Sequence, residues 1–287
     1  MSVREPAVAG MFYPAGAAEL KQEVESCFLG TGGPGGLPSV NPEGLRKIVG
    51  LVSPHAGFIY SGSVAAWAYH RLAEDGLPKI AVLIGPNHRS YFPAVALSDE
   101  SAWRTPIGEV ELDAAIAAEI ASSYADAKVE PSAHRAEHSL EVQLPFLQYI
   151  AGAGIRIVPI LIGASARSGD GTEAARELGG AIADALRGKD AVVIASTDFT
   201  HYESSEAARA KDLSAISKIL ELDEDGLLDT VEALDISMCG ALPTAATIAA
   251  SKKLGAASAR RLAYRNSGDV TGDYAEVVGY AALEIRK

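Results

Sequence analysis

The chain of 287 residues is poor in cysteine and in long apolar runs, and each scarcity excludes a class of protein. Its two cysteines, Cys27 and Cys239, cannot supply the disulfide framework of a small secreted domain. No uninterrupted run of about 18 apolar residues is present, so we predict no membrane span. Because the first residues lack the basic and then apolar layout of a signal peptide, we expect a cytoplasmic protein.

Positive charge is also scarce. The 25 Lys and Arg residues are outnumbered by 37 Asp and Glu residues, and they form no dense block. The net charge of -12 therefore argues against nucleic acid and anionic membranes as partners. The Gly/Pro-rich stretch at about 30–44 lacks the Lys-Ser/Thr ending of a phosphate loop. We interpret it as a surface loop and expect no nucleotide cofactor.

What the sequence does contain is an alternation of strand-like and helix-like segments. The strand-like runs are near-continuous in apolar residues, which is typical of strands covered on both faces. They lie at 47–53, 79–85, 93–98, 155–162, 190–196, 260–266 and 276–285. Helical patterns lie at 16–28, 63–74, 111–124, 138–151, 172–187, 203–221, 224–233 and 240–254. This alternation predicts a single α/β domain over 1–287, a three-layer α/β/α sandwich around a mixed, mostly parallel sheet.

Polar residues follow three of the predicted strands. His55 comes just after the first strand, His88 just after the second, and His201 shortly after the strand at 190–196. Cys239 precedes the predicted helix at 240–254, where a helix dipole favours the thiolate. Because parallel strands deliver their ends to one rim, these groups can share a transition-metal ion. The alternative is that each histidine is only a hydrogen-bonded loop residue.

The remaining polar residues of interest are Asp198 and four further side chains near predicted helices. Asp198 and His201 can form a proton-transfer pair beside a metal; alternatively, Asp198 caps a turn and His201 packs under the sheet. We place His138 and Glu141 in the cleft and His134 in solvent. His70 falls within a helical pattern, and we expect it on a helix face.

Six blocks of the sequence, in order, resemble the Memo family over nearly the whole chain. They are Arg4–Pro14, Pro54–Gly62, Gly85–His88, Glu137–Leu147, Ser196–Tyr202 and Cys239–Gly240. The nearest description within that family is the prokaryotic branch called AmmeMemoRadiSam system protein B. The family in turn is similar in fold to class III extradiol dioxygenases, which hold non-haem Fe(II) with two His and one Glu.

The resemblance implies roles for individual residues. His55 and His88 match the two metal-binding histidines, Cys239 stands in the position of the glutamate, and His201 matches the acid-base histidine. A thiolate in place of a carboxylate favours copper or zinc over Fe(II) and argues against dioxygenase activity. Tyr60, Asn87, His138 and Glu141 are expected to line the cleft as substrate-binding residues.

Three functions remain open at this point. The first is a redox metalloenzyme that uses copper or iron, with zinc as a further possibility. The second is a non-catalytic binding or accessory module that takes a small molecule or peptide in the cleft, or that partners a radical-SAM protein and an accessory protein. The third is a hydrolase with Cys239 as nucleophile and His201 as base.

Overall fold

The computed structural model describes residues 2–41, 45–89, 95–163 and 171–287. The elements, in chain order, are β1 (Val3–Arg4), α1 (Ala17–Leu29), β2 (Ile48–Ser53), α2 (Phe58–Asp75), β3 (Ile80–Pro86), β4 (Val95–Leu97), β5 (Ala102–Thr105), β6 (Gly108–Glu111), α3 (Ala114–Ser123), β7 (Ala127–Val129), α4 (Pro131–His134), the 3-10 turn Glu141–Gln143, α5 (Leu144–Ala151), the 3-10 turn Gly152–Gly154, β8 (Arg156–Ile162), α6 (Gly171–Ala185), β9 (Ala191–Ser196), β10 (His201–Glu203), α7 (Ser205–Leu220), α8 (Glu224–Ala233), α9 (Ala241–Lys253), β11 (Ser258–Asn266), α10 (Gly268–Thr271) and β12 (Val277–Arg286).

A large mixed sheet runs through the molecule in the order β10-β12-β2-β9-β3-β8-β4-β7, with β11 paired to β12. The four central strands β2, β9, β3 and β8 are parallel to one another. On either side of them, β12 runs antiparallel to β2 and β4 runs antiparallel to β8. The predicted parallel arrangement therefore holds for the centre of the sheet, and the flanks make the sheet mixed.

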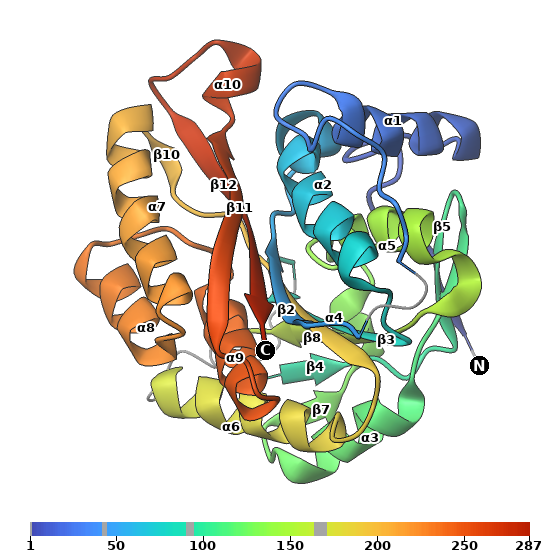
Figure 1. The fold of residues 1–287 in the computed structure, drawn as a ribbon. Coiled ribbons are helices and arrows are strands. Elements are labelled where there is room, and N and C mark those ends of the chain that lie inside the picture. The colour runs from blue at the N-terminus through green and yellow to red at the C-terminus, as the bar shows by residue number, and fades with distance from the viewer. Residues whose placement is uncertain (1, 42–44, 90–94, 164–170) are drawn as a thin grey trace.

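Helices flank both faces of this sheet (Figure 1). Side chains alternate between two hydrophobic cores along β3, because successive residues of a strand point to opposite faces. Ile80, Val82 and Ile84 pack into one core together with residues of α6 and α9. Ala81 and Leu83 pack into the other core together with residues of α1, α2 and α5. The predicted mixed α/β fold is thus confirmed, and its layers are consistent with an α/β sandwich.

Some elements differ from the prediction. A small sheet in the order β1-β5-β6 and the short strand β10 were not predicted. The helix predicted over 138–151 begins as a 3-10 turn and becomes the α-helix α5 only at Leu144. The reason is Pro145, which fits the first turn of a helix but not its interior.

The Gly/Pro-rich segment is described over residues 30–41 and contains no helix or strand there. It is tied to the body of the protein by Trp67, whose Nε1 donates to the carbonyl oxygen of Gly32 at 2.9 Å. Residues 42–44 of the predicted loop, and residues 93–94 of the strand predicted over 93–98, lie outside the described residues. Over the ranges given above, no helix is long and apolar enough to cross a membrane.

Candidate metal centre

The candidate site lies where the carboxyl ends of β2, β9 and β3 meet. Strand β9 lies between the other two, so its last residue, Ser196, falls between the loops that carry His55 and His88. The start of α9 packs against the end of β9 and forms one side of the site. It can approach β9 only because residue 240 is glycine: a Cβ there would lie 2.4 Å from the Thr197 Cβ and 2.7 Å from the Ser196 carbonyl oxygen.

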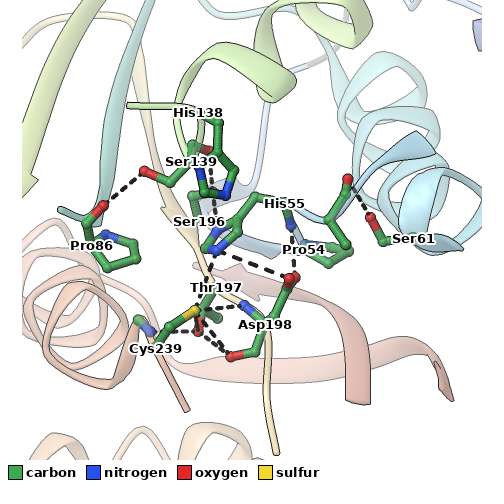
Figure 2. Close-up of polar contacts among 12 residues, drawn as sticks. Pro54, His55, Ser61, Pro86, His138, Ser139, Ser196, Thr197, Asp198 and Cys239 are labelled. Atoms are coloured by element: carbon green, nitrogen blue, oxygen red, sulfur yellow. Dashed lines mark hydrogen bonds and ion pairs between the residues drawn. The ribbon is translucent and has the colours of Figure 1, made fainter. Parts of the chain in front are cut away.

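This packing brings three predicted ligands together. The Cys239 Sγ atom lies 3.3 Å from His55 Nε2 (Figure 2). One ligand atom each from His55, His88 and Cys239 can be chosen so that all three lie within 4.8 Å of one another. The sequence prediction that these residues converge is therefore realised in the fold.

The hydrogen bonds around Ser196 set the tautomer of His55. The single hydroxyl proton of Ser196 is donated to the Ser139 carbonyl oxygen at 2.6 Å, and the hydroxyl oxygen accepts from Gln143 Nε2 at 2.8 Å. His55 Nδ1 lies 3.0 Å from the same oxygen, so it must be the donor. The lone pair of His55 is then on Nε2, which faces the sulfur of Cys239.

Glu137 orients His88 in the same way, by accepting a hydrogen bond from its Nδ1. No role was assigned to Glu137 from the sequence. Its carboxylate accepts from the His88 backbone at 2.5 Å, from His88 Nδ1 at 3.0 Å, and from the amides of His138 and Ser139 at 2.8 Å each. Burial opposes ionisation, but the hydrogen bonds that the carboxylate accepts from His88 lower the pKa of Glu137 to about 2. A carboxylate behind a ligating histidine leaves Nε2 free for a metal.

His138 forms the wall of the site. Its ring stacks on His88 with centroids 4.8 Å apart and meets the edge of His55 at 5.5 Å. Together with His88 and Glu137 it forms a second group of possible ligands. Burial lowers the pKa of His138 to about 4 and that of His55 well below its usual value, so both imidazoles are neutral, the form that binds metals.

Asp198 and His201 lie on the side of β10. The Asp198 carboxylate accepts from the His55 backbone at 2.8 Å, and its other oxygen lies 4.0 Å from His55 Nε2. Burial raises the pKa of Asp198 to about 6. His201 is half-buried, and its Nδ1 lies 2.9 Å from the carbonyl oxygen of Ser237. A proton-transfer role for this pair stays a prediction.

The expectation of a dipole-stabilised thiolate at Cys239 is wrong for the metal-free protein. Burial, together with the charge of Asp198, raises the pKa of the Cys239 thiol to about 12. Desolvation and the nearby carboxylate outweigh the start of α9, so the thiol is protonated at neutral pH. A protonated thiol disfavours the hydrolase hypothesis, because the thiolate is the nucleophile in such enzymes. A bound cation, in contrast, would favour ionisation of the Cys239 thiol.

Two residues lie elsewhere than predicted. Glu141 does not face a cleft: it is fully buried, and its oxygens accept from Arg4, from Tyr13 and from two backbone amides of the N-terminal segment. His134, expected in solvent, is also fully buried, with its ring 5.4 Å from that of Trp103. Arg4 of the N-terminal segment bonds to the Glu141 carboxylate and to the His134 carbonyl oxygen, 137 and 130 residues away along the chain.

A pocket of about 200 Å³ opens beside Cys239 and His88. Its lining residues are Pro86, Asn87, His88, Ile162, Gly163, Cys239, Leu242 and Pro243. Asn87 lines this pocket, whereas Tyr60 is not among the lining residues and is 41% exposed; a substrate-binding role for either stays a prediction. His70 lies on α2, as expected.

Fold and site together define an α/β protein with a candidate His/His/Cys metal centre. Residues 4–284 match the family described as Memo-like protein. The chain is 48% identical over 286 residues to a MEMO1 family protein of Methanopyrus kandleri, covering 99% of each. It is 46% identical over 283 residues to another from Methanothermobacter thermautotrophicus, covering 98% of this chain and 99% of the relative. The chain belongs to the Memo family.

Proposed function

We propose that this chain is a non-haem metalloprotein that binds one transition-metal ion through His55, His88 and Cys239. The observation that carries the proposal is the convergence of their donor atoms, with each histidine held through Nδ1 by its own hydrogen-bond acceptor. Nitrogen and sulfur ligands of one tetrahedral ion lie about 3.5 Å apart. The 3.3 Å between Cys239 Sγ and His55 Nε2 is close to that spacing.

The donor set indicates which ions suit the site. Two imidazoles and one thiolate favour copper or zinc. Iron is the further candidate, because the sequence resembles a family whose fold is similar to that of the class III extradiol dioxygenases. When bound, copper or iron would supply one-electron redox chemistry. A cysteine in place of a carboxylate argues against dioxygenase activity, so we propose a copper- or iron-dependent oxidoreductase of another kind.

The residues around the donor set would bind the substrate and handle protons. The pocket beside Cys239 is walled by Ile162, Leu242 and Pro243, so it suits a small molecule with an apolar part. With a pKa of about 6, Asp198 can take up and release a proton near neutral pH next to His55. His201, half-buried beside Ser237, would exchange that proton with solvent.

Cys239→Ser tests the proposal, with Cys27→Ala as the matched control. Cys27 is the other cysteine; it is buried in the core with α1 and α2, among apolar residues. Protein purified anaerobically should contain one copper, iron or zinc ion per chain in the wild type and in Cys27→Ala. Cys239→Ser should bind it far more weakly and lose any thiolate-to-metal absorption band. Sub-stoichiometric metal in the wild type and in both variants, even after incubation with each ion, would refute the proposal.

One observation favours a second function, that of a binding or accessory module. Two aromatic side chains, Tyr60 and Tyr202, are exposed, and the ring of Tyr202 lies 5.8 Å from that of His201. Exposed aromatic side chains are typical of surfaces that bind a peptide or a partner protein, such as a radical-SAM enzyme. If binding is the function, a purified radical-SAM partner should bind wild type and Cys239→Ser equally, and Tyr202→Ala should weaken that binding.

A further inference from the structure

The N-terminal segment, residues 4–13, packs against the segments that flank the candidate metal centre; we refer to it as the N-terminal strap. It starts at β1, where Arg4 is paired with Trp103 of β5. The Arg4 guanidinium lies 4.3 Å from the centre of the Trp103 ring, and Arg4 is 2% exposed. A buried arginine must satisfy its donors within the protein.

All three polar nitrogens of Arg4 bond to one short segment, residues 134–141. Nε donates to the His134 carbonyl oxygen at 2.8 Å, and Nη2 donates to the Glu137 carbonyl oxygen at 2.7 Å. Nη1 donates to the Glu141 carboxylate at 2.7 Å. The planar guanidinium therefore fixes the backbone of Glu137, whose side chain in turn holds His88.

The rest of the strap makes contact with both histidine-bearing loops. Tyr13 donates to Glu141 at 2.5 Å, and the Phe12 ring lies 4.6 Å from the ring of His138. The Phe12 carbonyl oxygen accepts from the amide of Phe58 at 2.8 Å, three residues after His55. The strap thus connects the loop after β2 to the segment that orients His88.

We propose that Arg4 is a positioning residue for the metal centre: it holds Glu137, and through Glu137 it holds His88 in the orientation that binds metal. The inference rests on the proposed function for its metal-binding part. Groups behind the ligands of a metal affect affinity because they keep each ligating nitrogen aimed at the ion. The strap extends that support by one further step, from the carboxylate to the backbone that carries it.

Arg4→Lys is the test variant. Lysine keeps a positive charge beside the buried Glu141, but a single ammonium group cannot donate to three acceptors in the planar arrangement that arginine fits. Tyr13→Phe is the matched control, since it removes one donor to Glu141 from the same strap and has no hydrogen bond to Glu137. If Arg4→Lys proves too unstable to purify, Arg4→Met combined with Glu141→Met removes the contact without leaving a lone buried charge.

The first measurement is amide hydrogen exchange in metal-free protein. The amides of His88, His138 and Ser139 all donate to the Glu137 carboxylate, so their exchange reports its position. In Arg4→Lys, these amides should exchange at least about tenfold faster relative to amides of α9, as expected for the loss of one hydrogen bond. In Tyr13→Phe, that ratio should not change.

The second measurement is metal affinity, determined by competition with a chelator. Arg4→Lys should bind metal about 10- to 100-fold more weakly than the wild type, whereas Tyr13→Phe should match the wild type. If Arg4→Lys and Tyr13→Phe exchange the three amides at the same relative rate, or bind metal with the same affinity, the proposal is overturned. The strap would then be a purely structural element. A wild type that binds no metal would refute the proposed function, while the exchange measurement would still decide whether Arg4 positions Glu137.

Discussion

At the scale of single residues, the site is prepared by hydrogen bonds on the far side of each imidazole. Ser196 accepts from His55 Nδ1, and Glu137 accepts from His88 Nδ1. Both Nε2 atoms are therefore left as acceptors that can bind a cation. The two histidines differ in one respect: a neutral hydroxyl supports His55, whereas a carboxylate supports His88.

Glu137→Gln should weaken metal binding by about 10- to 100-fold. The glutamate accepts from four N–H groups, and an amide replacing it would direct its own N–H₂ group at some of those donors. Titration with a competing chelator measures the change. Glu109→Gln, on the exposed strand β6, is the control and should bind like the wild type. An unchanged affinity in Glu137→Gln would contradict the positioning role.

Residue patterns in the sequence predicted which groups converge, but not what surrounds them. His55, His88 and Cys239 could be predicted to meet because each lies next to the end of a strand or the start of a helix. Glu141 and His134 were misplaced because their neighbours come from other parts of the chain: the His134 ring packs against Trp103 of β5, and the Glu141 carboxylate accepts from Arg4, 137 residues away. No local pattern reports a contact over that separation.

At the scale of elements, the site depends on how closely α9 approaches the end of β9. The Gly240 position shows how tight this approach is, since a Cβ there would overlap Thr197. Cys239 is placed by the start of α9, and the two histidines by loops after β2 and β3. Small movements of α9 along the sheet would separate the sulfur from both imidazoles.

Gly240→Ala should destabilise the protein by about 1–3 kcal/mol, the usual cost of overpacking a core, and should also lower metal affinity. The backbone oxygen of Ser196, 2.7 Å from the added Cβ, cannot move aside as a flexible side chain can. Urea unfolding and metal titration measure the two effects. Gly36→Ala is the control, because a Cβ at Gly36 meets no atom within 4 Å. If both variants behave alike, the α9 approach is not the constraint described above.

The central strands could be predicted from the sequence because their apolar runs are buried on both faces. The small sheet β1-β5-β6 and the strand β10 could not, since their strands have two to four residues and no alternation long enough to recognise. The small sheet matters for the site, because it holds Arg4 in register with Trp103. The proposed support of the candidate metal centre therefore lies in the least predictable part of the fold.

At the scale of the whole molecule, buried titratable groups link stability to pH. Burial lowers the pKa of His134 from 6.5 to about 3. Below about pH 6.5 the unfolded chain binds a proton at this residue, and the folded chain does not until about pH 3. The unfolding free energy must therefore fall as pH drops through this window, and the contribution of His134 is fully present only above it.

His134→Phe should flatten this dependence. Between pH 6 and pH 4, the wild type should lose up to about 1.4 kcal/mol of unfolding free energy per pH unit through His134, and the variant should lose less by that amount. Urea unfolding at a series of pH values gives the slopes. Cys27→Ala, which removes a buried thiol whose pKa is raised to about 12, should keep the wild-type slope. A wild-type slope in His134→Phe would show that other groups set the acid limit.

The central claim is that one metal ion is bound by two imidazoles and one thiolate, and X-ray absorption on protein purified without added metal tests it most directly. We predict one copper, iron or zinc ion per chain with one sulfur at about 2.3 Å and two nitrogens at about 2.0–2.1 Å. The sulfur should disappear from the spectrum of Cys239→Ser and persist in that of Cys27→Ala. An ion surrounded only by oxygen and nitrogen, or a spectrum that Cys239→Ser leaves unchanged, would contradict the claim.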